Sequence, residues 1–137
     1  MEFKRGNVQH LEINVSDLAK SKPFYDALLD WMGYKCFLEH RLFAGWENGE
    51  MRIFLTACFE PYKKAGFHRR NVGLNHFAFW AESNEDVDRF YRQFLLPRKI
   101  PILYDSPKIY PEYSPSYYAV YFEDPDRIKL EYFHRVD

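Results

Sequence analysis

Two histidines occupy equivalent positions in an internal repeat of this 137-residue chain. When the sequence is shifted by 66 residues, His10 falls on His76 and the pair Phe24-Tyr25 falls on Phe90-Tyr91. Imidazole nitrogens bind metal ions and carry protons near neutral pH, so both histidines are candidates for that chemistry. Two copies indicate a duplicated module rather than a solenoid, which needs at least three repeats.

The segment around His10 alternates between apolar and polar residues. This period of two over residues 8–15 is typical of a strand that packs one face on a core. The apolar members are Leu11, Ile13 and Val15, and the polar members on the opposite face are His10, Glu12 and Asn14.

The same parity brings a carboxylate to the face that carries His76. In the last predicted strand, residues 128–133, Leu130 is expected on the helix side, which leaves Glu131 on the open face. A single strand histidine is more often an ordinary hydrogen-bonded residue. Two histidines and one carboxylate together, however, are the set that binds a divalent metal and leaves positions open for substrate. The predicted metal ligands are therefore His10, His76 and Glu131.

Three further residues are candidates for catalysis. Glu12 is the candidate general base, two residues from His10 on the same face, although an ordinary hydrogen-bonding role explains it equally well. Phe122 is the expected core residue of the strand over residues 117–123, so Tyr117 and Tyr121 should face the open side and could donate hydrogen bonds to a substrate.

The elements that must position these residues form two modules of the order strand, helix, three strands. Asp17 caps the first predicted helix, where Pro23 predicts either a kink or a separate first turn with the main helix capped by Ser21. Ser83 caps the second helix. The prolines of residues 105–116 predict a long loop that could act as a lid. We expect one α+β domain over residues 1–137, with module one at 8–57, a linker at 58–71 and module two at 72–134.

Composition excludes several classes of protein. The net charge of −1 argues against nucleic-acid binding, and no run approaches the ~20 apolar residues of a membrane span. Cys36 and Cys58 lack a C-x-x-C spacing and are expected to be free thiols in a reducing cytoplasm, since the first residues have no apolar signal core. Five basic residues in the linker favour a solvated connector over an anion-binding loop.

These residues resemble the vicinal oxygen chelate superfamily, which includes glyoxalase I, fosfomycin and bleomycin resistance proteins and extradiol dioxygenases. The resemblance lies in the strand of His10, in Asp17 with Phe24-Tyr25, and in the final hairpin over residues 122–131. It implies two paired βαβββ modules that form a cupped mixed β-sheet, with the helices on the outer face and a metal in the cup.

The resemblance also implies a ligand set. His10, His76 and Glu131 match three of the four ligand positions of glyoxalase-type members, whereas the fourth position aligns with Phe54, which cannot bind a metal. A set of three ligands resembles instead the ligand sets of the fosfomycin resistance and extradiol dioxygenase branches. Arg127 is a second departure, because the family usually has glycine in that turn.

The expected function is that of a metal-dependent enzyme. A divalent zinc, manganese, nickel or iron ion would bind two oxygens of a small-molecule substrate and act as a Lewis acid. Lyase, isomerase, transferase and dioxygenase reactions all stay open, and the resemblance implies a homodimer. The alternative is a non-catalytic protein of the bleomycin resistance type, in which Trp46, Trp80, Phe54 and the tyrosine-rich loop would stack on a flat ligand.

Overall fold

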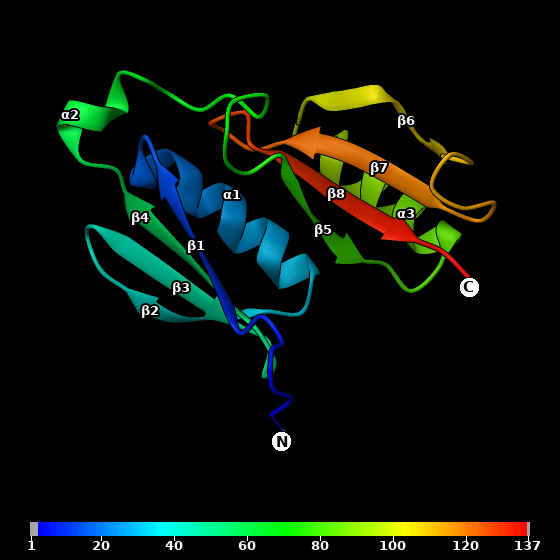
Figure 1. Ribbon diagram of the computed structural model, residues 1–137, viewed down its shortest axis with the longest axis horizontal. Helices are drawn as coiled ribbons and strands as arrows, with labels where there is room; N and C mark the ends of the chain where they lie inside the picture. Colours follow the sequence, from blue (N-terminus) through cyan, green and yellow to red (C-terminus); the bar gives the residue numbers. More distant parts are fainter. Residues whose placement is uncertain (1–2, 137) are drawn as a thin grey trace. The chain divides into compact units, whose positions relative to one another are not determined.

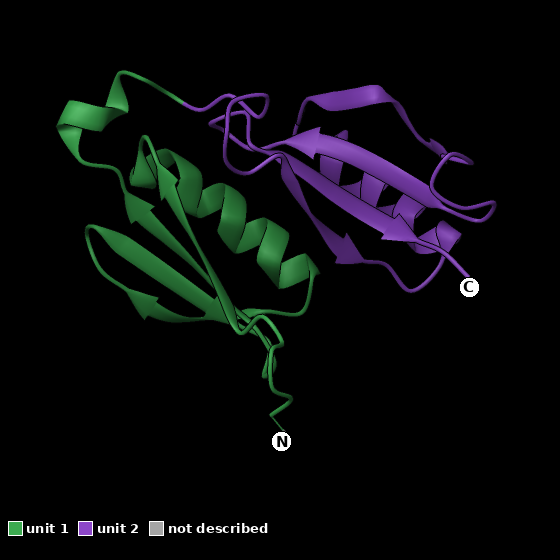
Figure 2. Cartoon of the chain, in the orientation of Figure 1, with its two compact units in different colours: residues 1–66 green, residues 67–137 purple. Residues whose placement is uncertain are grey.

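The computed structural model describes residues 3–136 and divides the chain into two compact units. Unit 1 is Met1–Gly66 and unit 2 is Phe67–Asp137 (Figure 2). Each unit holds a four-stranded mixed sheet with helices, which confirms the α+β class and the βαβββ order of each module.

Unit 1 has its strands in the order β1-β4-β3-β2, and β1 and β4 are parallel (Figure 1). Asp17 caps α1, as predicted, by accepting a hydrogen bond from the backbone N–H of Lys20. Pro23 lies inside this single helix, so the alternative of a separate turn with Ser21 as the cap is wrong. The element bounds are β1 (His10–Val15), α1 (Leu18–Trp31), β2 (Lys35–Glu39), β3 (Phe43–Glu47), β4 (Arg52–Ala57) and α2 (Glu60–Lys63).

Unit 2 repeats this topology with the order β5-β8-β7-β6, and β5 and β8 are parallel. Ser83 caps α3 through the backbone N–H of Asp86, and a short π-helical segment, η1, continues that helix. The bounds are β5 (His76–Trp80), α3 (Asn84–Phe90), η1 (Tyr91–Leu95), β6 (Ile102–Ile109), β7 (Tyr118–Glu123) and β8 (Lys129–His134).

One face of each sheet packs on its helix and forms the core. In unit 1 the helix α1 contacts β2, β3 and β4, and in unit 2 α3 contacts β7 and β8. The buried residues include Leu55 of unit 1. They also include Ile13, Phe122 and Leu130, which strand parity assigns to the core side. We call the opposite side of each sheet its open face.

The strand β6 extends into the segment for which the sequence predicts a loop. Residues 105–109 belong to it, so the lid predicted for 105–116 is wrong over this part. Its register with β7 shifts between Leu103 and Lys108, and such a bulge accommodates the proline that suggested a loop. Ser106 is buried in the bulge, where its hydroxyl donates to the Leu103 carbonyl and accepts from the Tyr121 N–H.

Cys36 and Cys58 are both free, as expected. None of the helices within residues 3–136 is long and apolar enough to cross a membrane.

Candidate functional site

The open face of unit 2 holds a buried carboxylate with two polar partners. Glu131 of β8 is 1% exposed, although it is a charged residue. Its Oε2 lies 3.1 Å from Nε2 of His76, and its Oε1 accepts a 2.5 Å hydrogen bond from the Tyr117 hydroxyl. A carboxylate without such partners would be very costly to bury, so these two contacts make its position possible.

Strand register explains why these side chains meet. On β8, Glu131 pairs with Ala78 of β5 on one side and with Tyr121 of β7 on the other. Residues directly opposite each other share a face, and His76 lies two residues before Ala78 on that same face. The structure therefore brings together His76, Glu131, Tyr117 and Tyr121, as strand parity predicts.

The two tyrosines act as hydrogen-bond donors in this site. Burial, followed by the adjacent Glu131 carboxylate, raises the pKa of the Tyr117 hydroxyl. Burial and the charge of Glu131 also raise the pKa of Tyr121, whose ring lies edge-on to His76 at 5.9 Å. Both phenols consequently keep their protons at neutral pH and can donate to oxygen atoms.

A side-chain amide orients each histidine. Nδ1 of His76 lies 2.6 Å from Oδ1 of Asn75, and Nδ1 of His10 lies 2.8 Å from Oε1 of Gln9. An amide oxygen only accepts hydrogen bonds, so Nδ1 of each histidine is the donor in this contact. A partner on the far nitrogen is the usual arrangement of a metal-binding histidine.

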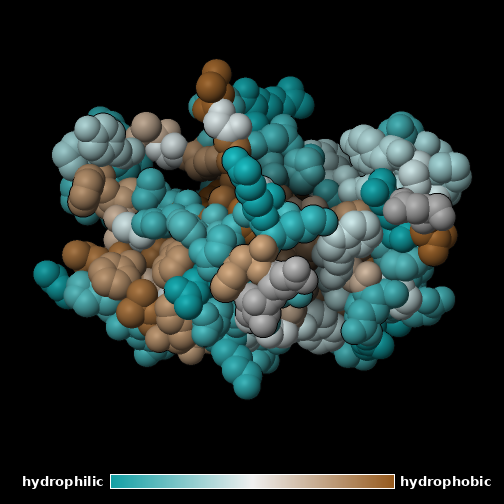
Figure 3. All heavy atoms as spheres, turned by 60° about the horizontal axis from the view of Figure 1, so that its bottom comes forward, coloured by the Kyte–Doolittle hydropathy of each residue, from teal (hydrophilic) through white to brown (hydrophobic). Residues whose placement is uncertain are grey.

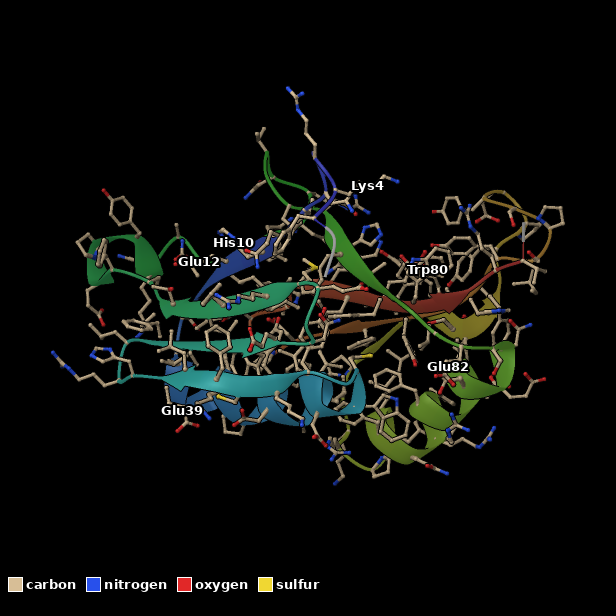
Figure 4. All side chains as sticks on the ribbon, turned by 90° about the horizontal axis from the view of Figure 1, so that it is seen from below. Lys4, His10, Glu12, Glu39, Trp80 and Glu82 are labelled. Atoms are coloured by element: carbon tan, nitrogen blue, oxygen red, sulfur yellow. The ribbon has the colours of Figure 1, made fainter. Side chains whose placement is uncertain are left out.

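Unit 1 carries different chemistry on its open face. Phe54 of β4 pairs with Glu12 of β1, and the corresponding pair in unit 2 is Glu131 with Ala78. The Phe54 ring lies edge-on to His10 at 5.8 Å. Glu12 is exposed and its Oε2 accepts a 2.7 Å hydrogen bond from the Thr56 hydroxyl. Figure 4 shows His10 and Glu12 together on β1, and Figure 3 shows apolar side chains on the surface of unit 1, where Phe37 is 41% exposed.

Trp46, which the alternative function uses as a stacking residue, is not on an open face. It is 1% exposed and its Nε1–H donates a 3.0 Å hydrogen bond to Asp26 of α1, so the stacking role predicted for it is wrong. The neighbouring core residue Ile53 pairs with it across the strands and shares this helix side. Trp80, by contrast, is 62% exposed and its ring lies 4.4 Å from that of Phe133.

The donor set of unit 2 fits a metal ion in part. The imidazole of His76 and the carboxylate of Glu131 are 3.1 Å apart and are both side-chain types that bind divalent transition metals. Within residues 3–136, no cluster of three or more histidine, cysteine, aspartate or glutamate side chains is already arranged to hold one. Sequence reasoning missed Gln9 and Asn75, although the 66-residue shift places one amide on the other.

The fold and these residues define a known class of protein. The chain belongs to the Glyoxalase/Bleomycin resistance protein/Dioxygenase superfamily, whose family model matches residues 7–132.

Two relatives at more than 30% identity support this membership, and a third protein shares the fold. The uncharacterized protein YqjT of Bacillus subtilis is 35% identical over 124 residues, which are 90% of this chain and 95% of YqjT. The crystal structure of a candidate glyoxalase from Bacillus halodurans is 36% identical, with a TM-score of 0.87 and coverage of 94% of this chain and 96% of that one. Lactoylglutathione lyase from Agrobacterium tumefaciens shares the fold at 20% identity, with a TM-score of 0.65 and coverage of 93% and 92%.

Proposed function

We propose that this protein is a metal-dependent enzyme of the superfamily that acts on a small oxygenated molecule. His76 and Glu131 are the proposed ligands in unit 2, and His10 is the proposed third ligand. The ligand role of His10 rests on the family pattern and on the matching amide contacts of the two histidines. Family membership also supports a homodimer, which sedimentation of the purified protein would measure.

The contact between His76 and Glu131 is the observation that carries this proposal. A carboxylate that is 1% exposed and lies 3.1 Å from an imidazole nitrogen is costly to maintain for packing alone. Buried carboxylates and histidines that face each other in an enzyme fold frequently mark a functional site.

The chain's own residues have separable tasks. Tyr117 holds the Glu131 carboxylate by its Oε1 and so fixes the direction of Oε2. Tyr121 keeps its proton and can donate to a substrate oxygen. Glu12 is the proposed general base, and the Thr56 hydroxyl orients its carboxylate. A bound divalent metal would supply Lewis-acid stabilisation of charge that develops on substrate oxygen.

Elemental analysis tests this proposal. We expect the wild-type protein, purified or reloaded after chelation, to hold a divalent zinc, manganese, nickel or iron ion, and the variants His10→Ala, His76→Ala and Glu131→Ala to lose it. His40→Ala is the matched control, because His40 is an exposed histidine that stacks on Phe43. A wild-type protein that takes up no divalent metal would overturn the proposal.

The identity of the metal in the purified protein also indicates the reaction class. Iron in the purified protein, with oxygen consumption that depends on an added substrate, would indicate a dioxygenase. Another metal would favour the lyase, isomerase or transferase reactions of the superfamily.

A second candidate function, sequestration of a flat molecule, is supported by a run of aromatic rings in unit 2. Trp80 lies 4.4 Å from Phe133, and Phe133 stacks on Tyr117 at 4.8 Å and 12°. Stacked rings with an exposed end suit a planar ligand. The test is binding of bleomycin to protein that has been treated with a chelator to remove metal, measured through quenching of Trp80 fluorescence. Tight binding that is lost in Trp80→Leu would favour this function over catalysis.

A further inference from the structure

A lysine lies beside the His76–Glu131 pair. Lys129 is the cross-strand partner of His76 in the parallel pair β5–β8, and it precedes Glu131 by two residues, so its side chain projects from the same open face. Its Nζ lies 4.7 Å from the ring centre of Tyr104 and 4.8 Å from that of Tyr121. Two aromatic faces therefore hold this ammonium group next to the proposed metal ligands.

The bulge in β6 brings Tyr104 to this place. Tyr104 and Asp105 have φ angles of 62° and 53°, a left-handed conformation that is uncommon for residues other than glycine. Bulges redirect side chains, and here the Tyr104 ring contacts that of Tyr121 at 5.4 Å. Burial acts to raise the pKa of the Tyr104 hydroxyl, but Lys129 and Arg69 outweigh it, so that this pKa lies below its ordinary value.

Arg69 adds a second cation from the linker. Its Nη1 donates a 3.1 Å hydrogen bond to Oε2 of Glu123, and Nε of Arg127 donates to the same oxygen at 3.2 Å. With His68 and Arg70, these two arginines also line a cavity of about 70 Å³. The linker is thus anchored to the end of β7 and is more than a solvated connector.

Positive charge exceeds negative charge in this group. The cations are Lys129, Arg69 and Arg127, and the carboxylates beside them are Glu123, which pairs with both arginines, and Glu131, which lies two residues from Lys129 on the same face. Among the described residues, Lys129 takes part in none of the ion pairs, so the half-buried ammonium has no anionic partner. The Lys129 ammonium can therefore pair with an anionic group of a ligand.

We propose that Lys129 and Arg69, together with the Tyr104 hydroxyl, bind an oxyanion group of the molecule that the His76–Glu131 site accepts. The substrate class is then a small oxygenated acid, either a carboxylic acid or a phosphate-type compound. This assignment to a substrate rests on the proposed function, whereas the anion site itself does not need the metal.

The experiment is an NMR titration of ¹⁵N-labelled, chelator-treated protein at constant ionic strength, with chloride as the reference. Inorganic phosphate and acetate serve as separate probes, so that the tighter one identifies the kind of oxyanion. We expect saturable shifts at Tyr104 and Lys129. Lys129→Met should bind the preferred anion about tenfold more weakly, the loss expected for one charge-assisted hydrogen bond.

Two variants control for charge and for folding. Lys99→Met removes an equal charge from the exposed turn after η1 in the same unit and should bind like the wild type. Lys129→Arg retains the charge and should restore most of the affinity. Absence of saturable shifts with either anion, or equal weakening in Lys99→Met, would overturn the anion site.

The metal readout separates this inference from the proposed function. If both the inference and the proposed function hold, His76→Ala loses the metal but still binds the anion. Lys129→Met then retains the metal and binds the anion about tenfold more weakly. Anion binding by a wild-type protein that takes up no metal would uphold the anion site while overturning the proposed function.

Discussion

Replacing Tyr117 with phenylalanine removes one hydroxyl from the site and leaves the ring in place. The ring stacks on Phe133 at 4.8 Å with an interplanar angle of 12°, and phenylalanine can keep that contact. The lost hydroxyl donates the 2.5 Å hydrogen bond to Oε1 of Glu131, a residue that is 1% exposed. The substitution therefore tests one polar interaction with little change in packing.

The size of the effect follows from the charge and burial of the acceptor. A hydrogen bond to a buried charged group contributes about 1.5–3 kcal/mol, and its loss leaves an acceptor without water. Tyr121, whose pKa Glu131 also raises, stays close to the carboxylate and limits the loss. We expect Tyr117→Phe to lower the free energy of unfolding by about 2 kcal/mol. Metal affinity should fall about tenfold, as for other groups that hold a ligand in place.

Urea unfolding with chelator present measures the first effect, and competition with a metal-binding dye measures the second. Tyr113→Phe is the matched control, because Tyr113 is 62% exposed and its ring contacts the Tyr117 ring at 5.3 Å. The reasoning is refuted if Tyr117→Phe costs less than about 0.5 kcal/mol, the range of ordinary surface substitutions. It is equally refuted if Tyr113→Phe costs as much.

Two further predictions concern stability. Asp86→Asn should cost about 2–3 kcal/mol in urea unfolding, because the buried carboxylate accepts from the Tyr132 hydroxyl and from Arg89. Burial acts to raise the pKa of Asp86, but these donors and the Glu82 N–H keep that pKa below its ordinary value. The contribution of Asp86 to stability is therefore full above about pH 4 and is lost as pH falls further. Asp86→Asn should show a shallower loss of stability below pH 4, and an equally steep loss would contradict this. Gly45→Ala should cost about 1–3 kcal/mol, since its Cβ would lie 2.9 Å from the Phe54 ring. Phe54→Leu should relieve part of that cost, and strictly additive losses in a double-mutant cycle would argue against the steric cause.

The sequence predicted that residues far apart in the chain share one face of the sheet. His76 and Glu131 are 55 residues apart, yet the period of two in each strand was enough to place both on one face. Parity works here because one face of the sheet packs on a helix, and a shift of one residue would bury the polar set. Their role as metal ligands remains a prediction.

The bulge of β6, the position of Tyr104 and the burial of Trp46 could not be predicted from the residue pattern. A proline usually ends a strand, and only the bulge in β6 explains how Pro107 stays within one. The same bulge brings Tyr104 to Lys129, so the cationic group was not predictable from spacing. Trp46 was assigned to ligand stacking from its residue type alone, whereas its register with Ile53 places it in the core.

The two units differ at matched positions, and the differences are linked. Phe54 pairs with Gly45 in unit 1, as Glu131 pairs with Tyr121 in unit 2. The Phe54 ring occupies the space that a side chain at residue 45 would need. A carboxylate at position 54 would have glycine as its cross-strand neighbour, where Glu131 has Tyr121, whose pKa it raises. The pairs Phe54–Gly45 and Glu131–Tyr121 therefore differ at both strands, because the Phe54 ring fits only opposite a residue without a side chain.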